Sequence, residues 1–354
     1  MNWLWLCSLP GIYRKQTGQL LDYYQTPEAI RYAGKKELDQ MPFLSEKQKD
    51  TILNAQKNMH PEELMYKIER SGIKFISCCE NRYPKLLKQI SDYPYGLFYK
   101  GNLPQEEEHC IAIVGARMCS NYGRKMAAEL SEALSVLNIS IVSGMAYGID
   151  GNAQAACVSK AGKSYAILGC GVDICYPKEH WELYEKIQEH GAVISEYPPG
   201  TPALPMHFPL RNRIISGLSR EIIVVEAKKK SGSLITADCA LEQGRDIYAV
   251  PGRTEDALSE GCNELIAQGA GIITGTKALL QALGLNPEKS KKREKKKNLL
   301  ATGENMVYSC LDSRPKTLQQ ISKETNLPAS EVMCTLGSLV MKGMVQENSG
   351  YYSK

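Results

Sequence analysis

Long apolar runs are missing from this chain of 354 residues. None approaches the roughly 18–20 residues that a helix needs to cross a bilayer. The apolar segment from Trp3 to Leu9 is short, and no basic residue precedes it, which is unlike a secretory signal peptide. We therefore expect a cytoplasmic protein with no membrane partner.

Paired-cysteine motifs are also missing, although the chain has 12 cysteines. No two of them have the C-x-x-C spacing that is typical of structural zinc sites, and the closest pair, Cys78 and Cys79, is adjacent. In a chain that we expect to stay in a reducing compartment, we interpret the cysteines as small buried apolar side chains. The sequence predicts no metal site and no cofactor.

An excess of charge of one sign is confined to one segment. The whole chain has a net charge of +4, but Lys289–Lys297 alone holds seven basic residues and one acid, so the rest of the chain is slightly acidic. This segment follows Asn286-Pro287 and has no apolar residue, which favours a solvated linker. A direct contact with nucleic acid is the alternative. Elsewhere, affinity for polyanions has to come from local patches.

What the chain does contain is a repeated unit between residues 110 and 284. Each unit has a short β-branched apolar run, a turn rich in Gly or Pro, and a helical stretch. Runs that are apolar on both faces indicate buried parallel strands, and the spacing leaves room for one crossover helix between them. The sequence therefore predicts an α/β fold, a Rossmann-like doubly wound and mostly parallel sheet. The expected strands are Ile111–Val114, Ile139–Val142, Tyr165–Leu168, Ala192–Ile194, Ile222–Val225, Ile247–Val250 and Ile272–Ile273.

The two flanks have other patterns. Residues 1–80 contain helical segments separated by Pro and Gly, which predicts a small helical N-terminal domain. We place the extended core at 81–284, a basic linker at 285–298 and a last domain at 299–354. The helices expected in the N-terminal part are Pro27–Tyr32, Ser45–Asn58 and Pro61–Ser71.

The last domain has the pattern of a winged helix-turn-helix. Three helical segments precede a two-strand candidate, Met344–Tyr352. The expected recognition helix, Ser330–Met341, has no Arg or Lys, whereas helices that read bases usually present Arg, Lys, Asn or Gln. We therefore expect a protein-contact or regulatory role for this domain.

The turns after the strands hold the functional information, because ligands of doubly wound sheets bind at the carboxyl ends of the strands. The first turn runs from Gly115 to Gly123 and lacks the G-x-G-x-x-G spacing, so NAD-type binding is disfavoured. It offers a glycine for close backbone approach, the guanidinium of Arg117, and Ser120 at a helix start. These features suit a phosphate.

The later turns add further anion ligands. Ser143 and Gly144 open the second turn, and Lys178 ends the third, which is also rich in glycine. Taken alone, the arginines of a fourth turn are equally consistent with anion binding and with solvated charge. Taken together, the turns predict an extended rim that binds a run of phosphates. The remaining rim residues are Arg211, Asn212 and Arg213 in the fourth turn and Ser231, Gly232, Ser233 and Thr236 in the fifth.

The motifs over residues 80–284, in their order, resemble the DNA-processing protein A (DprA, or Smf) family. They are Val114–Arg117 with Ser120 and Tyr122-Gly123, Ser143-Gly144 with Gly148–Asp150, Ser195-Glu196 with Pro198–Gly200, Phe208-Pro209 with Arg211–Ile215, Ser231–Ser233 with Thr236-Ala237, Gln243–Arg245, Pro251-Gly252 and Gly261–Asn263. Family members often carry a sterile-alpha-motif-like helical domain before this core and a winged-helix unit after it.

The resemblance implies a protein that binds single-stranded DNA, protects incoming DNA in natural transformation, and loads a RecA-type recombinase onto it. It also implies a homodimer through the Rossmann-like core. One departure is Gln154, where many members have His shortly after Gly-Ile-Asp. The role of this residue stays open.

The alternative function is a Rossmann-like nucleotide-processing enzyme similar to the phosphoribohydrolases. Those enzymes use a P-G-G-x-G-T-x-x-E turn, which this chain lacks after Glu226. Glu196 and Glu226 lie at strand ends, where catalytic acids are found, but we interpret them as groups that cap or pair with a rim arginine. We interpret Asp150 as a helix cap. No Ser/His/Asp or Cys/His arrangement is evident. We therefore expect no enzymatic activity and no catalytic residue.

Overall fold

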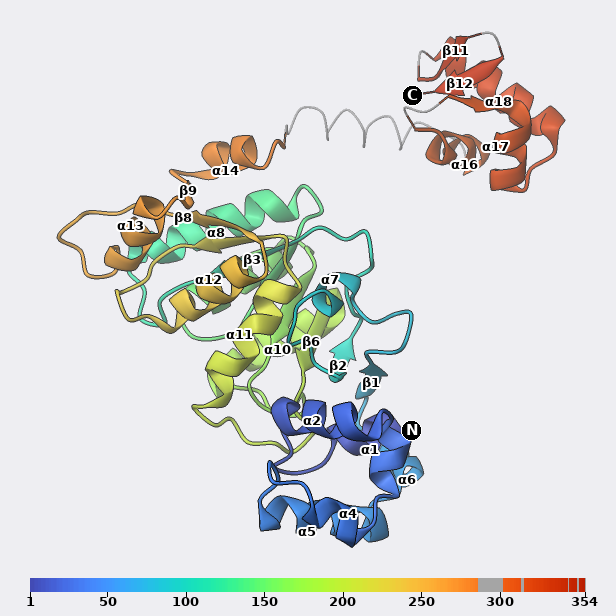
Figure 1. Ribbon diagram of the computed structural model, residues 1–354. Helices are drawn as coiled ribbons and strands as arrows, with labels where there is room; N and C mark the ends of the chain where they lie inside the picture. Colours follow the sequence, from blue (N-terminus) through green and yellow to red (C-terminus); the bar gives the residue numbers. More distant parts are fainter. Residues whose placement is uncertain (286–301, 313–314, 343, 349, 354) are drawn as a thin grey trace. The chain divides into compact units, whose positions relative to one another are not determined.

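A computed structural model describes residues 1–285, 302–312, 315–342, 344–348 and 350–353. The chain forms two compact units, Met1–Gly284 and Leu285–Lys354. The first unit holds the helical N-terminal part and the sheet (Figure 1). Nearly all of the predicted basic linker, 285–298, lies outside the described residues. No described helix has the length and apolar character that a membrane span requires.

The first unit is built on one nine-stranded sheet, ordered β1-β2-β6-β5-β4-β3-β7-β8-β9. The strands from β6 to β9 in this order are parallel, while β2 is antiparallel to β6 and β1 to β2. The predicted α/β fold is therefore confirmed. The strands are β1 (Lys74–Ser77), β2 (Gly96–Gly101), β3 (Cys110–Val114), β4 (Ser140–Ser143), β5 (Ser164–Ile167), β6 (Gly191–Ser195), β7 (Glu221–Val224), β8 (Asp246–Ala249) and β9 (Gly271–Ile272).

All seven predicted strands are present, each displaced by one or two residues at most. The sequence did not reveal β1 and β2. Residues of β1 fall in the part that we expected to be helical, and β2 lies in the segment leading into the core. Both strands extend the antiparallel edge of the sheet, and their pairing depends on a partner far along the chain rather than on a local pattern.

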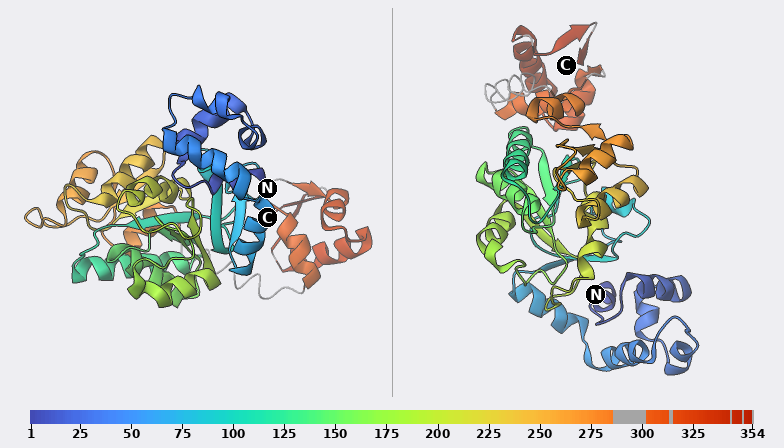
Figure 2. Two further views of the ribbon diagram at one scale, coloured as in Figure 1. Left: turned by 90° about the horizontal axis from the view of Figure 1, so that it is seen from below. Right: turned by 90° about the vertical axis from the view of Figure 1, so that its left-hand side faces the viewer.

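Helices cover both faces of this sheet (Figure 2). On one face, α8 and α10 pack against α9, and on the other α11 packs against α7 and α12. The core between them is apolar. The helices of this part are α7 (Lys85–Lys88), α8 (Asn121–Ser135), α9 (Ile149–Ser159), the short η1 (Lys178–His180), α10 (Trp181–His190), α11 (His207–Gly217), α12 (Gly232–Glu242), α13 (Glu260–Ala267) and α14 (Thr276–Ala282).

The N-terminal part has six helices, of which α1 to α5 surround an apolar cluster with Trp5 and Leu20 fully buried in it. The apolar residues of α6 pack into a cluster of the sheet core instead. Ser45 starts α5 with a capping box, in which its hydroxyl accepts from the amide of Gln48. The three predicted helices are present; α1, α2 and α4 were not predicted. The six helices are α1 (Asn2–Cys7), α2 (Arg14–Tyr24), α3 (Pro27–Arg31), α4 (Lys35–Asp39), α5 (Glu46–Asn58) and α6 (Pro61–Arg70).

Among the described residues of the second unit are three helices and a small sheet, the elements that we predicted for a winged helix-turn-helix. The sheet has three strands in the order β10-β12-β11, one more than the predicted hairpin. The extra strand, β10, is only two residues long, too short to give a sequence pattern. The elements are α16 (Thr302–Cys310), β10 (Lys316–Thr317), α17 (Leu318–Thr325), α18 (Ala329–Met341), β11 (Gln346–Asn348) and β12 (Tyr351–Ser353).

The cysteines are all free thiols, but only some have the buried environment that we predicted. Six are buried, four are half-buried, and Cys79 and Cys334 are exposed. Where a thiol is buried, the apolar surroundings disfavour the thiolate: burial raises the pKa of Cys157 to about 11 and that of Cys262 to about 12. The described residues contain no cluster of His, Cys, Asp and Glu able to hold a metal ion.

Candidate nucleic-acid interface

A cavity of about 430 Å³ opens at the carboxyl ends of β3 and β7. From β3, the chain order runs to β4, β5 and β6 on one side and to β7, β8 and β9 on the other, so this is the point where the strand order reverses. Doubly wound sheets bind their ligands at such points. Eight of the predicted rim residues line the cavity: Gly115, Arg117, Arg211, Asn212, Ser231, Gly232, Ser233 and Thr236.

Arg117 is an exposed cation of this cavity. It follows β3, and its guanidinium carbon lies 5.3 Å from the centre of the Phe208 ring. The same ring is 5.9 Å from the guanidinium carbon of Arg211 and 5.3 Å from the ring centre of Tyr176. Arg117 forms no salt bridge with any described residue. It is therefore held over an aromatic face with its N–H donors open to a ligand.

Arg211 lies deeper and is only 3% exposed. Its Nη1 donates to the carbonyl of Gly144 at 3.0 Å, and its Nε donates to Asn212 Oδ1 at 3.1 Å. Gly144 is required at this close contact, because a Cβ there would stand 2.1 Å from Nη2. Burial lowers the pKa of Arg211 to about 10, opposed by the charge of Asp150, so the side chain stays protonated at neutral pH.

Asp150 is the acid of this cavity. Burial raises the pKa of its carboxyl, while Arg211 and the amide of Gly144 act in the opposite direction. The amide of Gly144 donates to its Oδ2 at 3.1 Å. Asp150 thus opposes the charge of the buried guanidinium and fixes the turn after β4. We expected it to cap a helix, but α9 begins after Gly148 without a side-chain cap hydrogen bond.

The N-terminus of α12 forms the opposite wall. Ser231 caps the helix, and its hydroxyl lies 2.8 Å from that of Ser233. Asn212 Nδ2 donates to the carbonyl of Gly232 at 3.1 Å, which ties α11 to the start of α12. The first amides of a helix have no partner within it and carry its positive dipole end. This wall therefore offers N–H donors to an anion.

The other five predicted rim residues do not line the cavity. Ser120 caps α8 and also donates from its amide to Glu226, at 2.8 Å. Ser143 is fully buried and donates to the carbonyl of Ile113 in β3, at 2.6 Å. Gly144 does not line the cavity itself, but its carbonyl accepts a hydrogen bond from Arg211, which does. Lys178 is exposed in η1 but apart from the cavity lining.

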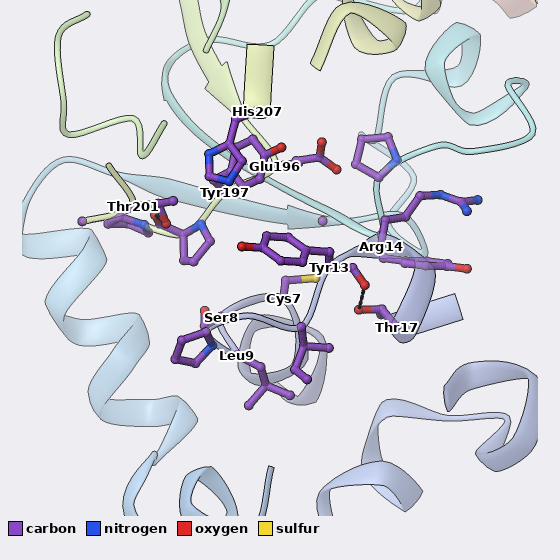
Figure 3. A pocket seen from close by; sticks show the side chains of 18 of the residues that line it. Cys7, Ser8, Leu9, Tyr13, Arg14, Thr17, Glu196, Tyr197, Thr201 and His207 are labelled. Atoms are coloured by element: carbon purple, nitrogen blue, oxygen red, sulfur yellow. Dashed lines mark hydrogen bonds between the residues drawn. The ribbon is translucent and has the colours of Figure 1, made fainter. Parts of the chain in front are cut away.

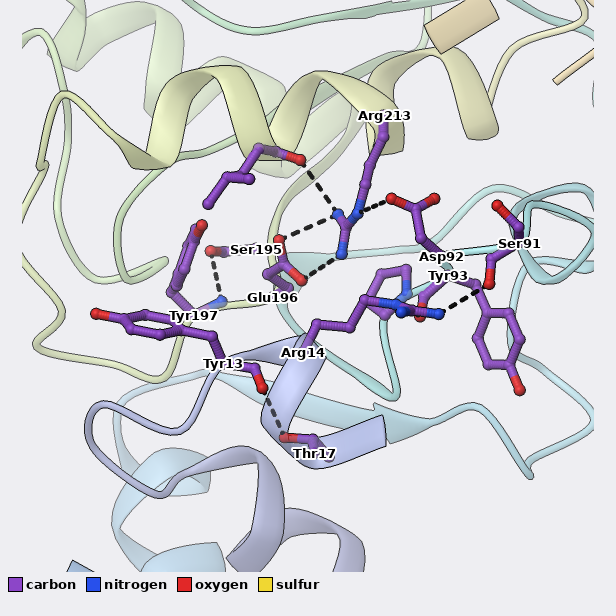
Figure 4. A network of polar contacts seen from close by, with 12 residues as sticks. Tyr13, Arg14, Thr17, Ser91, Asp92, Tyr93, Ser195, Glu196, Tyr197 and Arg213 are labelled. Carbon is purple, nitrogen blue, oxygen red and sulfur yellow. Dashed lines mark hydrogen bonds and ion pairs between the residues drawn. The ribbon is translucent and has the colours of Figure 1, made fainter. Parts of the chain in front are cut away.

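Arg213 is the fifth, and it differs most from the expectation. Its guanidinium pairs with two carboxylates, Glu196 at 2.7 Å and Asp92 at 2.9 Å (Figure 4). Although burial alone lowers the pKa of Arg213, these acids raise it above its usual value. Asp92 is distant in sequence and Glu196 lies 17 residues before Arg213, so the triplet Arg211–Arg213 by itself gave no sign that its two arginines separate. The donors of Arg213 are occupied by the protein itself.

The remaining acids and Gln154 also have structural partners. Glu226 is 3% exposed and accepts from the amide and hydroxyl of Ser120. Gln154 is fully buried: its Oε1 accepts from the amide of Met145, and its Nε2 donates to the carbonyl of Tyr165. It links α9 to β5 and to the turn after β4. In this chain, position 154 therefore orients backbone beside the cavity.

Lys228 and Lys230 are cavity residues that we did not include in the rim. They are exposed and belong to the turn between β7 and α12. Their signal was the run of three lysines before Ser231, of which Lys229 does not line the cavity. Phe208 also lines it, as one of the aromatic residues near these turns. With Arg117 and Arg211, the lining holds four cations and the single carboxylate of Asp150.

Residues 74–284 match the family model of DNA recombination-mediator protein A. The chain belongs to this family. The match begins at β1 and ends with the first unit, so it covers the whole sheet and the cavity. The resemblance seen in the sequence motifs is confirmed.

Named relatives agree with this assignment. The DNA processing protein DprA of Streptococcus pneumoniae is 45% identical over 204 residues, which are 58% of this chain and 72% of that protein. Protein Smf of a Synechocystis strain is 33% identical over 298 residues, 83% of this chain and 75% of the relative.

Two solved structures are similar in fold. DNA processing protein A from Streptococcus pneumoniae aligns with a TM-score of 0.68 and 35% identity, covering 79% of this chain and 97% of that one. DNA processing protein A from Helicobacter pylori, described for its single-stranded DNA binding mode, aligns with a TM-score of 0.54 and 28% identity. This second alignment covers 60% of this chain and 95% of the other.

Proposed function

We propose that this protein binds single-stranded DNA in the cavity at the ends of β3 and β7. The observation that carries the proposal is the pairing of Arg117, exposed and without a salt bridge, with the N-terminus of α12 across one cavity. A guanidinium holds a phosphate by two parallel N–H bonds, and a helix N-terminus receives a second anion. The named binding mode of the Helicobacter pylori structure supports the same ligand class.

The cavity explains how a strand is held without reading its sequence. Lys228, Lys230 and Arg117 line one opening, so successive phosphates of one strand meet separate cations. Such contacts release counterions and depend on salt, but carry no base information. Phe208 is half-buried beneath Arg117, and the exposed ring of Tyr176 lies next to it. We propose that bases stack on this aromatic group, which is tolerant of sequence.

The finer role follows the family. We propose that the protein acts in DNA processing during natural transformation, protects the incoming strand in the cytoplasm, and loads a RecA-type recombinase onto it. We also propose a homodimer through the Rossmann-like core, which would place two cavities on one strand and raise the overall affinity without new contacts. Light scattering at micromolar concentration is expected to give about twice the chain mass of 39.3 kDa.

Binding to oligonucleotides of increasing length tests the central proposal. Single strands should bind more tightly as length increases, more tightly than duplex of equal length, and less tightly as salt is raised. The alternative, a nucleotide-processing enzyme, gives the opposite pattern. Tight binding of a nucleoside monophosphate with release of its base, and no binding of oligonucleotides, would contradict our proposal.

A further inference from the structure

A second cavity, of about 1030 Å³, lies between the helical N-terminal part and the sheet core (Figure 3). Both of its walls belong to the first compact unit. The helical wall comes from the segment between α1 and α2 and from α6, and the core wall from residues 196–204 and the start of α11. No residue of the proposed DNA cavity except Pro209 lines this one as well.

Its lining has the character of a small-molecule site. Ligand pockets have volumes of roughly 300–1,000 Å³, are mainly apolar with a few placed polar groups, and often lie between substructures. Here Leu9, Ile68 and Leu204 supply apolar surface. Tyr13 and Tyr197 supply aromatic rings, from the helical wall and the core wall respectively (Figure 3).

Two buried polar atoms in the walls have no hydrogen-bond partner among the described residues: Ser8 Oγ and His207 Nε2. His207 is 1% exposed, and its Nδ1 lies 3.1 Å from the carbonyl oxygen of Gly169. A carbonyl only accepts, so Nδ1 carries the proton, and Nε2 of the neutral ring is a bare acceptor. Buried polar groups are almost always satisfied, so these two atoms indicate a missing partner. His207 Nε2 needs an N–H or O–H donor, and the Ser8 hydroxyl can pair with either a donor or an acceptor.

Tyr13 lies beside the ring that carries this acceptor. Its ring lies 6.1 Å from that of His207, edge to face, while Tyr197 stacks on the His207 ring at 4.1 Å. Tyr13 is 40% exposed, and its side chain forms no hydrogen bond in the part of the chain that the structure describes. A rotation of Tyr13 would break its edge contact with the His207 ring but no hydrogen bond of the Tyr13 side chain.

The charges along the lining favour an anion. The lining holds three carboxylates and four cations, one of which is Arg14. Glu196 and Asp92 share the single guanidinium of Arg213, and Asp173 accepts from the amide of Gly200 at 2.9 Å. By contrast, Lys15 and Lys67 line the helical wall, are exposed, and have no salt bridge among the residues described. These two ammonium groups are free to meet a negative group on a ligand.

We propose that this cavity is a binding site for a small aromatic anion that carries an N–H or O–H donor. The ring packs between the tyrosine-bearing walls, and the donor reaches His207 Nε2 or Ser8 Oγ. The anionic group meets Lys15 and Lys67. This site is separate from the proposed DNA cavity and does not depend on that function.

Anilinonaphthalene sulfonate is a suitable probe, because it combines aromatic rings, one N–H and one sulfonate. The folded full-length chain should bind it saturably, one probe per chain, with enhanced fluorescence. Leu204→Trp fills the cavity and should weaken binding by about tenfold or more, a loss readily seen in a titration. Leu241→Trp is the matched control, because Leu241 is also an exposed leucine and lies outside both cavities. This variant should bind the probe as tightly as the unchanged chain.

Further variants test the polar groups. Ser8→Ala removes an unpartnered hydroxyl, so it should leave the melting temperature unchanged. It should weaken binding of the probe several-fold. The double variant Lys15→Ala with Lys67→Ala should bind the sulfonate probe more weakly. Lys57→Ala should not, because Lys57 is an exposed lysine outside the cavity.

Two results would overturn the proposal. One is unsaturable binding, or binding that Leu204→Trp leaves unchanged. The other is displacement of the probe by an oligonucleotide, which would place the probe in the DNA cavity instead.

Discussion

At the scale of the residue, two arginines that look alike in the sequence have different tasks. Arg211 and Arg213 flank Asn212 in α11, but the first faces the DNA cavity and the second is held by Glu196 and Asp92. A buried ion pair that loses one member leaves an uncompensated charge and destabilises a fold strongly. Loss of DNA binding in an Arg213 variant would therefore reflect the fold, and Arg117 is the better test.

Arg117→Ala should weaken single-strand binding by about 1.5–3 kcal/mol, the range for hydrogen bonds to charged groups. It should also make the slope of log affinity against log salt concentration shallower by roughly 0.7, the contribution of one phosphate contact. Fluorescence anisotropy at several salt concentrations measures both. Arg220→Ala is the control, since Arg220 is exposed at the opposite end of the strands, just before β7. Equal losses in the two variants would count against a localised phosphate contact.

Gly144→Ala should lower both stability and DNA affinity. The added Cβ would stand 2.1 Å from Nη2 of Arg211, and overpacking of this kind typically costs about 1–3 kcal/mol. Thermal unfolding and binding should be measured on the same preparation. Gly232→Ala offers a comparison, because nothing lies within 4 Å of a Cβ there and stability should be retained. An unchanged melting temperature for Gly144→Ala would show that Arg211 moves freely.

At the scale of the element, the turn between β7 and α12 contains its own control. Lys228 and Lys230 line the cavity, but the equally exposed Lys229 does not. We expect Lys228→Ala with Lys230→Ala to reduce affinity and to flatten the salt slope by up to two contacts. Lys229→Ala should change neither quantity by much. If all three lysines contribute equally, the turn acts only through its diffuse charge.

The amino ends of β3, β4 and β5 are joined by Glu108. Burial alone raises the pKa of this carboxyl, but hydrogen bonds from Ser140, Tyr165 and Lys163 outweigh it, so that the net shift is downward. A group with a depressed folded pKa stabilises the fold above its unfolded pKa, and this contribution is lost as the pH falls through the folded pKa.

Glu108→Gln should therefore lower the free energy of unfolding at neutral pH and make it less dependent on pH on the acid side. Chemical unfolding at neutral and acidic pH measures this difference. Glu107→Gln changes an exposed neighbour and serves as the control. A Glu108→Gln variant that keeps the full acid dependence would show that other carboxylates dominate.

At the scale of the whole molecule, the second compact unit is separate from the cavity-bearing one. Its helix α18 carries Glu331 and no Arg or Lys before Lys342. Removal of residues 299–354 should leave single-strand affinity within a few fold. A gel-shift assay with single-stranded DNA, run on the full-length and the shortened chain, measures this difference. The melting temperature of the first unit checks that the shortened chain is folded. Loss of most binding would give this unit a direct role at DNA.

The sequence by itself determined the architecture of the core. Strands buried on both faces must be apolar throughout, and the crossover helices between them fix their spacing, so both features are local and can be read directly. The same reasoning predicted a cavity-bearing edge of the sheet, because parallel strands bring all of their following turns together. Arg117, Ser231 and Gly232 were placed correctly at the cavity on these grounds.

Only the tertiary structure decided which side chains share a cavity and which are already paired. Asp92, one of the two acids that hold Arg213, lies far from it in the chain, and β1 and β2 become strands only by pairing at the edge of the sheet. The second cavity likewise exists only where the helical part meets the core. These outcomes depend on contacts between distant segments, and the energy of such contacts leaves no periodic signal in either segment alone.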